Sequence, residues 1–223
     1  MGKLILVPTP IGNLEDITLR ALHVLRDCDI LYAEDTRVTK KLLNHFEIHK
    51  MVKSFHAHNE HRLLDRYIEE IKNNTACALV SDAGTPGISD PGFLLVRACL
   101  KEQIEVECLP GPTALIPALV ASGFPCDTFV FEGFLPHKKG RQTTLQRIEK
   151  ETRTVLFYES PHRLLKCLEQ MEIIFGEDRR ICVVREISKK FETYHRGNVK
   201  EMKEYFQNND PKGEIVLVVE GKK

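Results

Sequence analysis

The segment AEDTR brings two carboxylates and a guanidinium together directly after a short apolar run. A carboxylate such as Glu34 or Asp35 can accept a proton from a hydroxyl group, and Arg37 can hold a phosphate. The structural alternative is that Asp35 or Thr36 caps the next helix while Arg37 simply pairs with Asp35. Two adjacent acids and an arginine exceed what a cap requires, so we predict Asp35 as a candidate catalytic residue and Arg37 as a substrate contact.

A second polar segment, HAHNE, follows the next apolar run and contains His56, Asn59 and Glu60. A single histidine in that position is usually structural, whereas these three side chains together suit acid–base work on a hydroxyl group. One of Asp35, His56 or Glu60 is therefore predicted to orient that hydroxyl or to accept its proton, with Asn59 on the substrate. The residue types do not decide between the three.

The same segment, extended to HAHNEH, fits the pattern HxHxxH, which is close to the zinc-binding HxHxDH of metallo-β-lactamase-like hydrolases. Glu60 stands where those enzymes have aspartate, and the later histidines of the chain stand in no matching context. The segment also runs into Leu63 and Leu64, which begin an apolar helical stripe. We therefore predict no metal site.

Three loops rich in glycine and proline follow predicted strands: PTPIGN (8–13), SDAGTPGISDPG (81–92) and LPGPTA (109–114). In open parallel sheets, ligands bind on the loops outside the carboxyl ends of the strands. One loop of this kind is more often a tight turn than a binding site. Three of them in one sheet predict a crevice lined by bare amides and carbonyls, with Asp82 and Asp90 as further acids.

The composition of these loops narrows the class of ligand. Neither GxGxxG nor GxxxxGK[ST] occurs, so the fingerprints of a dinucleotide site and of a Walker phosphate loop are missing. Proline has no amide hydrogen, so a loop interrupted by proline presents carbonyls rather than the nest of amides that binds phosphate. An uncharged or cationic ligand suits these loops better than a triphosphate.

Alternating strands and helices must position these loops. Short apolar runs, each followed by a segment of helical periodicity, predict a mostly parallel sheet covered by helices. The second half of the chain has strand candidates in succession near its end, which favours a mixed sheet. We predict two α/β domains, 1–121 and 122–223, divided near the turn GFPCDT. The strands expected in the first domain are 3–8, 29–35, 51–55, 76–81 and 104–110.

The charge balance excludes a globally basic protein. The chain of 223 residues has 32 Lys plus Arg and 32 Asp plus Glu, so a nucleic-acid site must be a local patch. PHKKGRQTTLQR (136–147) has several cations and no acid, although an ordinary exposed helix can also be basic. We predict that this segment holds nucleic-acid phosphates through Lys138, Lys139 and Arg141, with Arg163 of SPHR beside them.

Cysteine usage and the lack of long apolar runs predict a cytoplasmic protein. The seven cysteines include no CxxC pair and mostly lie in apolar stretches, as small buried side chains do in a reducing compartment. No apolar run approaches the ~20 residues of a membrane span. The apolar run at the N-terminus is too short for a signal peptide.

Eight motifs resemble, in order and spacing, the tetrapyrrole methylase superfamily. They are LILVPTPIGNLEDIT, AEDTR, HAHNE, LVSDAGTPGISDPG, LPGPTA, EGFLP, FYESPHR and KGEIVLVVE, and together they span essentially the whole chain. Within the superfamily they are most similar to the branch that methylates the ribose 2′-hydroxyl of a cytidine in small-subunit (16S) ribosomal RNA. TPIGNL together with SDAGTPGISDPG is the most specific part of this resemblance.

The resemblance implies a methyltransferase that binds S-adenosylmethionine, folded, in a cleft between the two domains. It also implies small-subunit rRNA as the substrate and a homodimer as the assembly. A sulfonium cation and an adenine need carbonyls and closely approaching backbone, which agrees with the loop composition. By motif position, the implied cofactor contacts are Pro10, Gly12, Ala83, Gly84, Thr85, Ile88, Thr113, Ala114, Tyr158, Gly213, Glu214 and Ile215.

Two alternatives change the acceptor or the activity. Methylases of the tetrapyrrole pathway and diphthine synthase share this architecture, so the acceptor could be a tetrapyrrole or another small molecule. Those relatives favour a GxGxGD-like first loop and GDP in the second loop, where this chain has TPIGN and GTP. A non-catalytic module that only holds RNA is the other alternative, and the many polar loop residues argue against it.

Overall fold

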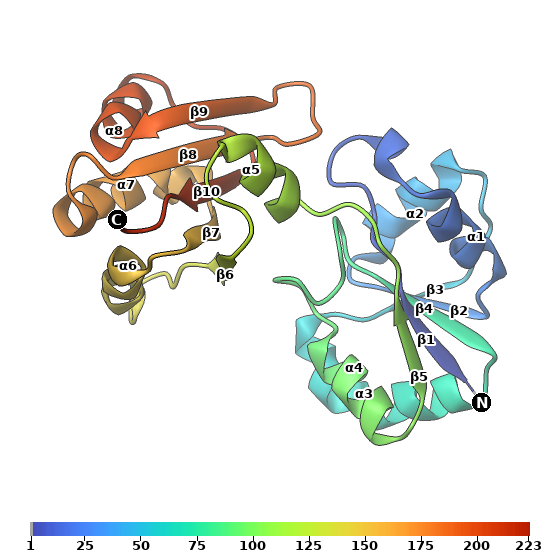
Figure 1. The fold of residues 1–223 in the computed structure, drawn as a ribbon. Helices are drawn as coiled ribbons and strands as arrows, with labels where there is room; N and C mark the ends of the chain where they lie inside the picture. Colours follow the sequence, from blue (N-terminus) through green and yellow to red (C-terminus); the bar gives the residue numbers. More distant parts are fainter. Residues whose placement is uncertain (1) are drawn as a thin grey trace. The chain divides into compact units, whose positions relative to one another are not determined.

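The structure, a computed structural model, describes residues 2–223 except for the side chains of residues 57–62. The chain divides into two compact units, Met1–Thr113 and Ala114–Lys223. Each unit contains one five-stranded sheet with helices packed on it (Figure 1). The fold is therefore two α/β units, as predicted. No helix in the described part of the chain has both the length and the apolar character needed to cross a membrane.

The first unit is a parallel sheet between two pairs of helices. Its strand order is β3-β2-β4-β1-β5, and all neighbouring strands run parallel. Both faces of such a sheet are buried, which explains why its strands read as nearly continuous apolar runs. The elements are β1 (Lys3–Leu6), η1 (Leu14–Asp16), α1 (Leu19–Asp27), β2 (Ile30–Ala33), α2 (Thr36–His45), β3 (Val52–Ser54), α3 (Ala57–Lys72), β4 (Ala76–Val80), α4 (Phe93–Lys101) and β5 (Glu105–Cys108).

Alternate side chains of these strands build a separate core on each face of the sheet. Along β1 and just beyond it, Ile5 and Val7 join the core under α1 and α2, whereas Leu4 and Leu6 join the core under α3 and α4. The loop after β1 therefore leads to one face, and the loop after its neighbour β4 leads to the other (Figure 1). Ligand crevices in open α/β sheets form where neighbouring strands diverge in this way.

The second unit contains the mixed sheet that the sequence predicted. Its strand order is β6-β7-β10-β8-β9, in which β6 and β7 are parallel and the other pairs are antiparallel. Helices α6, α7 and α8 cover its main apolar core. The elements are α5 (Leu115–Ser122), β6 (Phe129–Phe134), α6 (Arg141–Lys150), β7 (Thr154–Glu159), α7 (Pro161–Phe175), β8 (Arg180–Arg185), β9 (Thr193–Asn198), α8 (Val199–Asn208) and β10 (Ile215–Val219).

Helix α5 lies with the second unit. It contacts strands β7 to β10, it buries Leu115 and Leu119, and the carbonyl oxygen of Ala121 accepts a 2.9 Å hydrogen bond from Arg196 Nε. The division between the units falls at 113/114, before this helix, whereas the predicted boundary at 121/122 falls at its last residue. An apolar helix beside a linker can pack on either neighbour, so its tertiary contacts decide where it belongs.

Helix α8 has no counterpart in the sequence analysis. Asn198 caps it and forms a capping box with Glu201, while Val199, Met202 and Phe206 are buried along one side. Asparagine followed three residues later by glutamate, with apolar residues at helical spacing, is the local signal for such a helix.

Candidate functional site

The loops after β1 and β4 are joined at the carboxyl edge of the first sheet. Thr9 and Gly84 form an isolated antiparallel bridge, in which each backbone amide donates a 2.9 Å hydrogen bond to the other residue's carbonyl. The buried Thr9 hydroxyl adds a 3.2 Å hydrogen bond to the carbonyl oxygen of Ser81. The two loops therefore hold one another at the point where the neighbouring strands diverge.

The loop after β5 packs against the other two. The Thr85 hydroxyl donates a 3.2 Å hydrogen bond to the carbonyl oxygen of Pro112. Gly111 lies so close to Pro8 that a Cβ built on it would be 2.6 Å from Pro8 Cβ. Because β4, β1 and β5 are consecutive in the sheet, the three glycine- and proline-rich loops lie side by side. The prediction that they meet is confirmed.

Glycine is required in the second loop for its backbone shape. Gly84 and Gly87 have φ of 82° and 84°, in the left-handed region that other residues rarely adopt. A Cβ built on Gly87 would have no atom within 4 Å, so the backbone there borders open space. The loop thus presents bare backbone, as its composition predicts.

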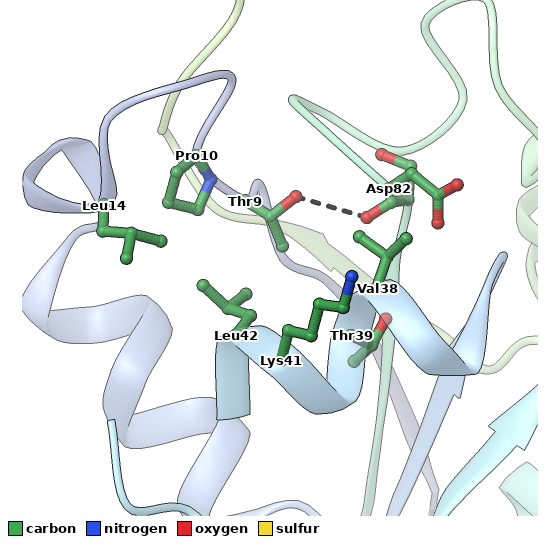
Figure 2. Close-up of a pocket in the computed structure, with 9 residues that line it drawn as sticks. Thr9, Pro10, Leu14, Val38, Thr39, Lys41, Leu42 and Asp82 are labelled. Carbon is green, nitrogen blue, oxygen red and sulfur yellow. Dashed lines mark hydrogen bonds between the residues drawn. The ribbon is translucent and has the colours of Figure 1, made fainter. Parts of the chain in front are cut away.

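A pocket of about 240 Å³ lies between the first loop, helix α2 and the end of β4 (Figure 2). Pro10, Leu14, Val38 and Leu42 supply apolar walls, and the side chain of Lys41 runs along it. Of the predicted cofactor contacts, Pro10 alone lines this pocket. The complete lining is Thr9, Pro10, Leu14, Val38, Thr39, Lys41, Leu42, Ser81 and Asp82.

Acidic residues that follow β2 and β4 meet beside these loops. The backbone amide of Asp35 donates a 2.9 Å hydrogen bond to Asp82 Oδ1, and the amide of Asp82 lies 3.5 Å from Glu34 Oε2. Burial, reinforced by the negative charge of Asp82, raises the pKa of the Glu34 carboxyl above its ordinary value. His56, which follows β3 on the same edge, acts on Glu34 in the opposite direction. Glu34 is therefore a better proton acceptor than an ordinary glutamate carboxylate.

Asp35 is engaged in a different way. Its side chain accepts a hydrogen bond from the Arg37 amide as the N-cap of α2, and it pairs with the Arg37 guanidinium at 2.6 Å. These contacts hold the pKa of Asp35 down at about 2, so its carboxylate is a weak base. Both parts of the structural alternative for AEDTR are thus realised, and the more suitable base is Glu34, which sequence analysis considered without choosing. Both residues are half-buried, and what the fold makes different is their partners: Glu34 lies beside Asp82, whereas Asp35 pairs with Arg37.

The candidates from HAHNE are only partly described. His56 is half-buried, whereas Asn59 and Glu60 lie outside the residues whose side chains the structure describes. Most of the HxHxxH pattern lies there as well. Among the side chains that are described, no three His, Cys, Asp or Glu residues are arranged to hold a metal ion.

The predicted cofactor residues of the second unit come together at one end of its sheet. Tyr158 pairs with Val216, next to Ile215, across the antiparallel strands β7 and β10. The Tyr158 ring also makes edge contacts with two phenylalanines of β6. Gly213 has φ of 81° and packs against the carboxylate of Glu186, which accepts a 2.9 Å hydrogen bond from the Glu214 amide. The predicted set is contiguous within this unit.

The remaining predicted contacts lie at the loops of the first unit or at its junction with α5. Gly12, Ala83 and Ile88 are exposed on the first and second loops, and Ile88 keeps 38% of its surface accessible. Thr113 ends the first unit, and the half-buried Ala114 is the N-cap residue of α5.

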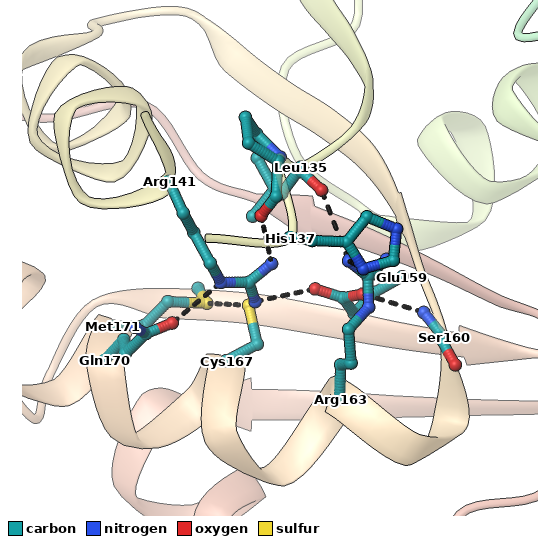
Figure 3. A network of polar contacts seen from close by, with 10 residues as sticks. Leu135, His137, Arg141, Glu159, Ser160, Arg163, Cys167, Gln170 and Met171 are labelled. Carbon is teal, nitrogen blue, oxygen red and sulfur yellow. Dashed lines mark hydrogen bonds and ion pairs between the residues drawn. The ribbon is translucent and has the colours of Figure 1, made fainter. Parts of the chain in front are cut away.

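The basic segment after β6 divides into exposed and buried cations. Lys138 and Lys139 are exposed. Arg141 is only 5% exposed, and its Nη2 pairs with Glu159 Oε2 at 2.7 Å. Arg163 is mostly buried and pairs with Glu159 Oε1, also at 2.7 Å (Figure 3). The prediction that Arg141 contacts phosphate is therefore corrected: its charge is turned inward to neutralise a buried carboxylate.

The two sheets, with three glycine- and proline-rich loops at the carboxyl ends of β4, β1 and β5, define the fold that the comparisons with solved structures identify. Three solved structures share this fold: cobalt precorrin-4 methyltransferase with a TM-score of 0.72 and 16% identity, diphthine synthase with 0.71 and 14%, and uroporphyrin-III-C-methyltransferase from Thermus thermophilus with 0.65 and 19%. Each comparison covers at least 98% of this chain and at least 90% of the other chain. At these identities the comparisons establish that the chain shares the fold of these three enzymes.

This chain belongs to the tetrapyrrole (corrin/porphyrin) methylase family, whose family model matches residues 3–203. Among curated relatives, "Ribosomal RNA small subunit methyltransferase I" of Thermotoga maritima is 48% identical over 222 residues, which cover all of both chains. The protein of the same name from Escherichia coli O157:H7 is 50% identical over 225 residues, covering all of this chain and 79% of the relative. The resemblance seen in the sequence motifs is confirmed.

Proposed function

We propose that this protein transfers a methyl group to the ribose 2′-hydroxyl of a cytidine in small-subunit ribosomal RNA. The observation that carries the proposal is identity near one half, sustained over the full chain, to relatives named as methyltransferases of that RNA. The three joined loops and the neighbouring acids of the first unit support it, because they provide a ligand-binding edge with a proton acceptor on it.

S-adenosylmethionine, when bound, supplies the methyl group from a sulfonium cation. The residues present fit such a molecule. Gly87 offers backbone that borders open space for close approach, and Glu34 and Asp82 place negative charge where a cation is favoured. Prolines in the loops remove amide donors that would select phosphate. The proposed contacts are Pro10, Gly12, Ala83, Gly84, Thr85, Ile88, Thr113 and Ala114, with Tyr158 and Gly213 to Ile215 from the second unit.

Glu34 is the residue that we propose as the acceptor of the hydroxyl proton. Its raised pKa brings it nearer to the working pH than an ordinary carboxyl group, which is the condition for efficient general-base catalysis. Asp82 and Asp35 shape this edge through the hydrogen bond that the Asp35 amide donates to the Asp82 carboxylate. His56 and Glu60 remain candidates for orienting the ribose.

RNA is proposed to contact Lys138 and Lys139 of the second unit and Arg37 of the first, whose side chain remains 86% exposed although it pairs with Asp35. The working form is proposed to be a cytoplasmic homodimer. Light scattering at micromolar concentration tests the assembly, and a monomer would contradict it.

Methyl-labelled S-adenosylmethionine and small ribosomal subunits that lack the modification test the proposed function directly. Label on the 2′-oxygen of one cytidine is the expected result. If the protein binds S-adenosylmethionine by calorimetry and the subunits gain no label, the acceptor is instead a tetrapyrrole or another small molecule. Absence of cofactor binding would overturn both versions.

A further inference from the structure

Glu159, the last residue of β7, is a buried carboxylate held by two arginines. Its side chain has no exposed surface. Arg141 Nη2 meets one oxygen and Arg163 Nη2 meets the other, each at 2.7 Å, and the Ser160 amide donates a 2.8 Å hydrogen bond to Oε1 (Figure 3). Arg141 Nε is fixed in addition by a 2.8 Å hydrogen bond to Gln170 Oε1.

The Nη1 groups of both arginines hold the segment that joins β6 to α6. Arg141 Nη1 donates to the carbonyl oxygen of Pro136 at 3.4 Å. Arg163 Nη1 donates to the carbonyl oxygen of Leu135 at 3.4 Å and lies 3.2 Å from His137 Nδ1. Glu159 orients the two guanidinium groups, and these in turn fix the backbone of residues 135–137.

The next residues along this segment are its free cations. Lys138 and Lys139 are exposed, and neither ammonium group has a hydrogen-bond or ion-pair partner among the residues that the structure describes; the Lys138 carbonyl oxygen accepts a 3.3 Å hydrogen bond from the Arg141 amide. The sequence has no acid between Glu132 and Glu149, and Arg147 is already paired with Glu132 at 2.6 Å. The two lysines therefore present charge that the protein itself does not neutralise.

The buried network adds to this charge. Two arginines against one glutamate leave one net positive charge beneath the segment, and Arg163 Nε is buried without a hydrogen-bond partner among the described residues. Two neighbouring lysines above a net-positive network favour a partner that carries closely spaced negative charges. The phosphate backbone of a nucleic acid is such a partner.

We propose that Glu159, acting through Arg141 and Arg163, is a positioning residue that fixes Lys138 and Lys139 to bind consecutive phosphates of the RNA substrate. This inference rests on the proposed function and deepens it. A buried ion pair by itself seldom stabilises more than apolar packing would. Here each arginine also donates from Nη1 to a main-chain carbonyl oxygen of residues 135–137. The network therefore holds that segment in place.

The test compares three sets of variants in binding to unmodified small ribosomal subunits and in methyl transfer to them. Lys138→Ala with Lys139→Ala removes the phosphate contacts, and Glu159→Gln removes the charge that orders the arginines. Lys101→Ala with Lys150→Ala is the matched control, because both lysines are exposed at the ends of helices α4 and α6. Cofactor affinity by calorimetry and the unfolding midpoint are measured for every variant.

The double lysine variant is expected to raise KM for subunits with kcat unchanged. Each phosphate contact contributes about 0.7–0.9 to the slope of log affinity against log salt, so the slope should fall by about 1.4–1.8. The defect relative to wild type would then be about tenfold larger at ~50 mM salt than at ~200 mM. The control pair should leave the slope unchanged.

Glu159→Gln separates positioning from simple stability. We expect it to raise KM and lower the salt slope while cofactor affinity stays at the wild-type value, and to have no further effect once both lysines are alanine. An effect that adds fully to that of the lysines would overturn the inference. Should this variant unfold, Arg163→Lys keeps the charge but loses the second donor to the loop, and the same non-additivity applies. A wild-type protein that never labels subunits would refute the proposed function instead.

Discussion

Thr9 and Gly84 exchange two backbone hydrogen bonds of 2.9 Å each, and this bridge joins the loops that follow β1 and β4. The bridge lies where neighbouring strands of the parallel sheet send their chains to opposite faces. Gly84 can take part because its φ of 82° costs glycine little. The candidate site is therefore fixed by backbone contacts between segments far apart in the sequence.

Gly111→Ala should separate the first and third loops. The added methyl group would lie 2.6 Å from Pro8 Cβ, so one of the two loops must move. We expect affinity for S-adenosylmethionine, measured by calorimetry, to fall at least about tenfold, since a small misplacement of positioning groups is costly. Gly176→Ala is the control, because a Cβ there meets no atom within 4 Å. It should lower stability by about 1–3 kcal/mol, because φ of 86° with ψ of 168° is a backbone region almost confined to glycine, and it should leave cofactor affinity unchanged.

Thr85→Arg should abolish S-adenosylmethionine binding while thermal unfolding stays cooperative. Thr85 is half-buried at the meeting point of the second and third loops, and a long cation there would occupy the proposed site and repel a sulfonium. Thr85→Ser keeps the hydroxyl that donates to Pro112 and is expected to retain binding. Normal affinity in the arginine variant would place the cofactor elsewhere.

Glu34→Gln should lower kcat by roughly 10²–10⁴-fold, the usual contribution of a general base. The wild-type rate should rise with pH through a pKa above the ~4.3 of an ordinary glutamate, because burial favours the protonated form. A raised pKa also means that Glu34 disfavours the folded state as pH rises, so the glutamine variant should be no less stable at neutral pH. Initial rates of methyl transfer measured across pH check the first statement, and unfolding midpoints of the two proteins check the second. A variant with full activity would remove Glu34 from the mechanism.

Asp35 is expected to act through structure. Asp35→Asn keeps an N-cap side chain on α2, so stability should change by only a few tenths of a kcal/mol and kcat by much less than in the Glu34 variant. Asp35→Ala removes the cap and should lower the free energy of unfolding by about 1 kcal/mol. Denaturant unfolding measures the difference. A kcat loss in Asp35→Asn as large as in Glu34→Gln would restore Asp35 as the catalytic base.

The sequence by itself determined the class of fold, the place of the binding loops and the family. These features are local, because the apolar runs that form β1, β4 and β5 are each followed directly by a glycine- and proline-rich loop. Parallel strands put all their carboxyl ends at one edge, so a local pattern is enough to predict that those loops meet.

Only the tertiary structure decided which charged groups are available for chemistry. Glu34 and Asp35 are adjacent and chemically alike, yet Glu34 is desolvated beside Asp82, 48 residues away, while Asp35 is held by Arg37. Arg141 looks like its neighbours Lys138 and Lys139, but Glu159, 18 residues further on, draws it into the interior. Burial and the partner of a charge depend on contacts between distant segments, and a pattern of neighbouring residues does not contain them.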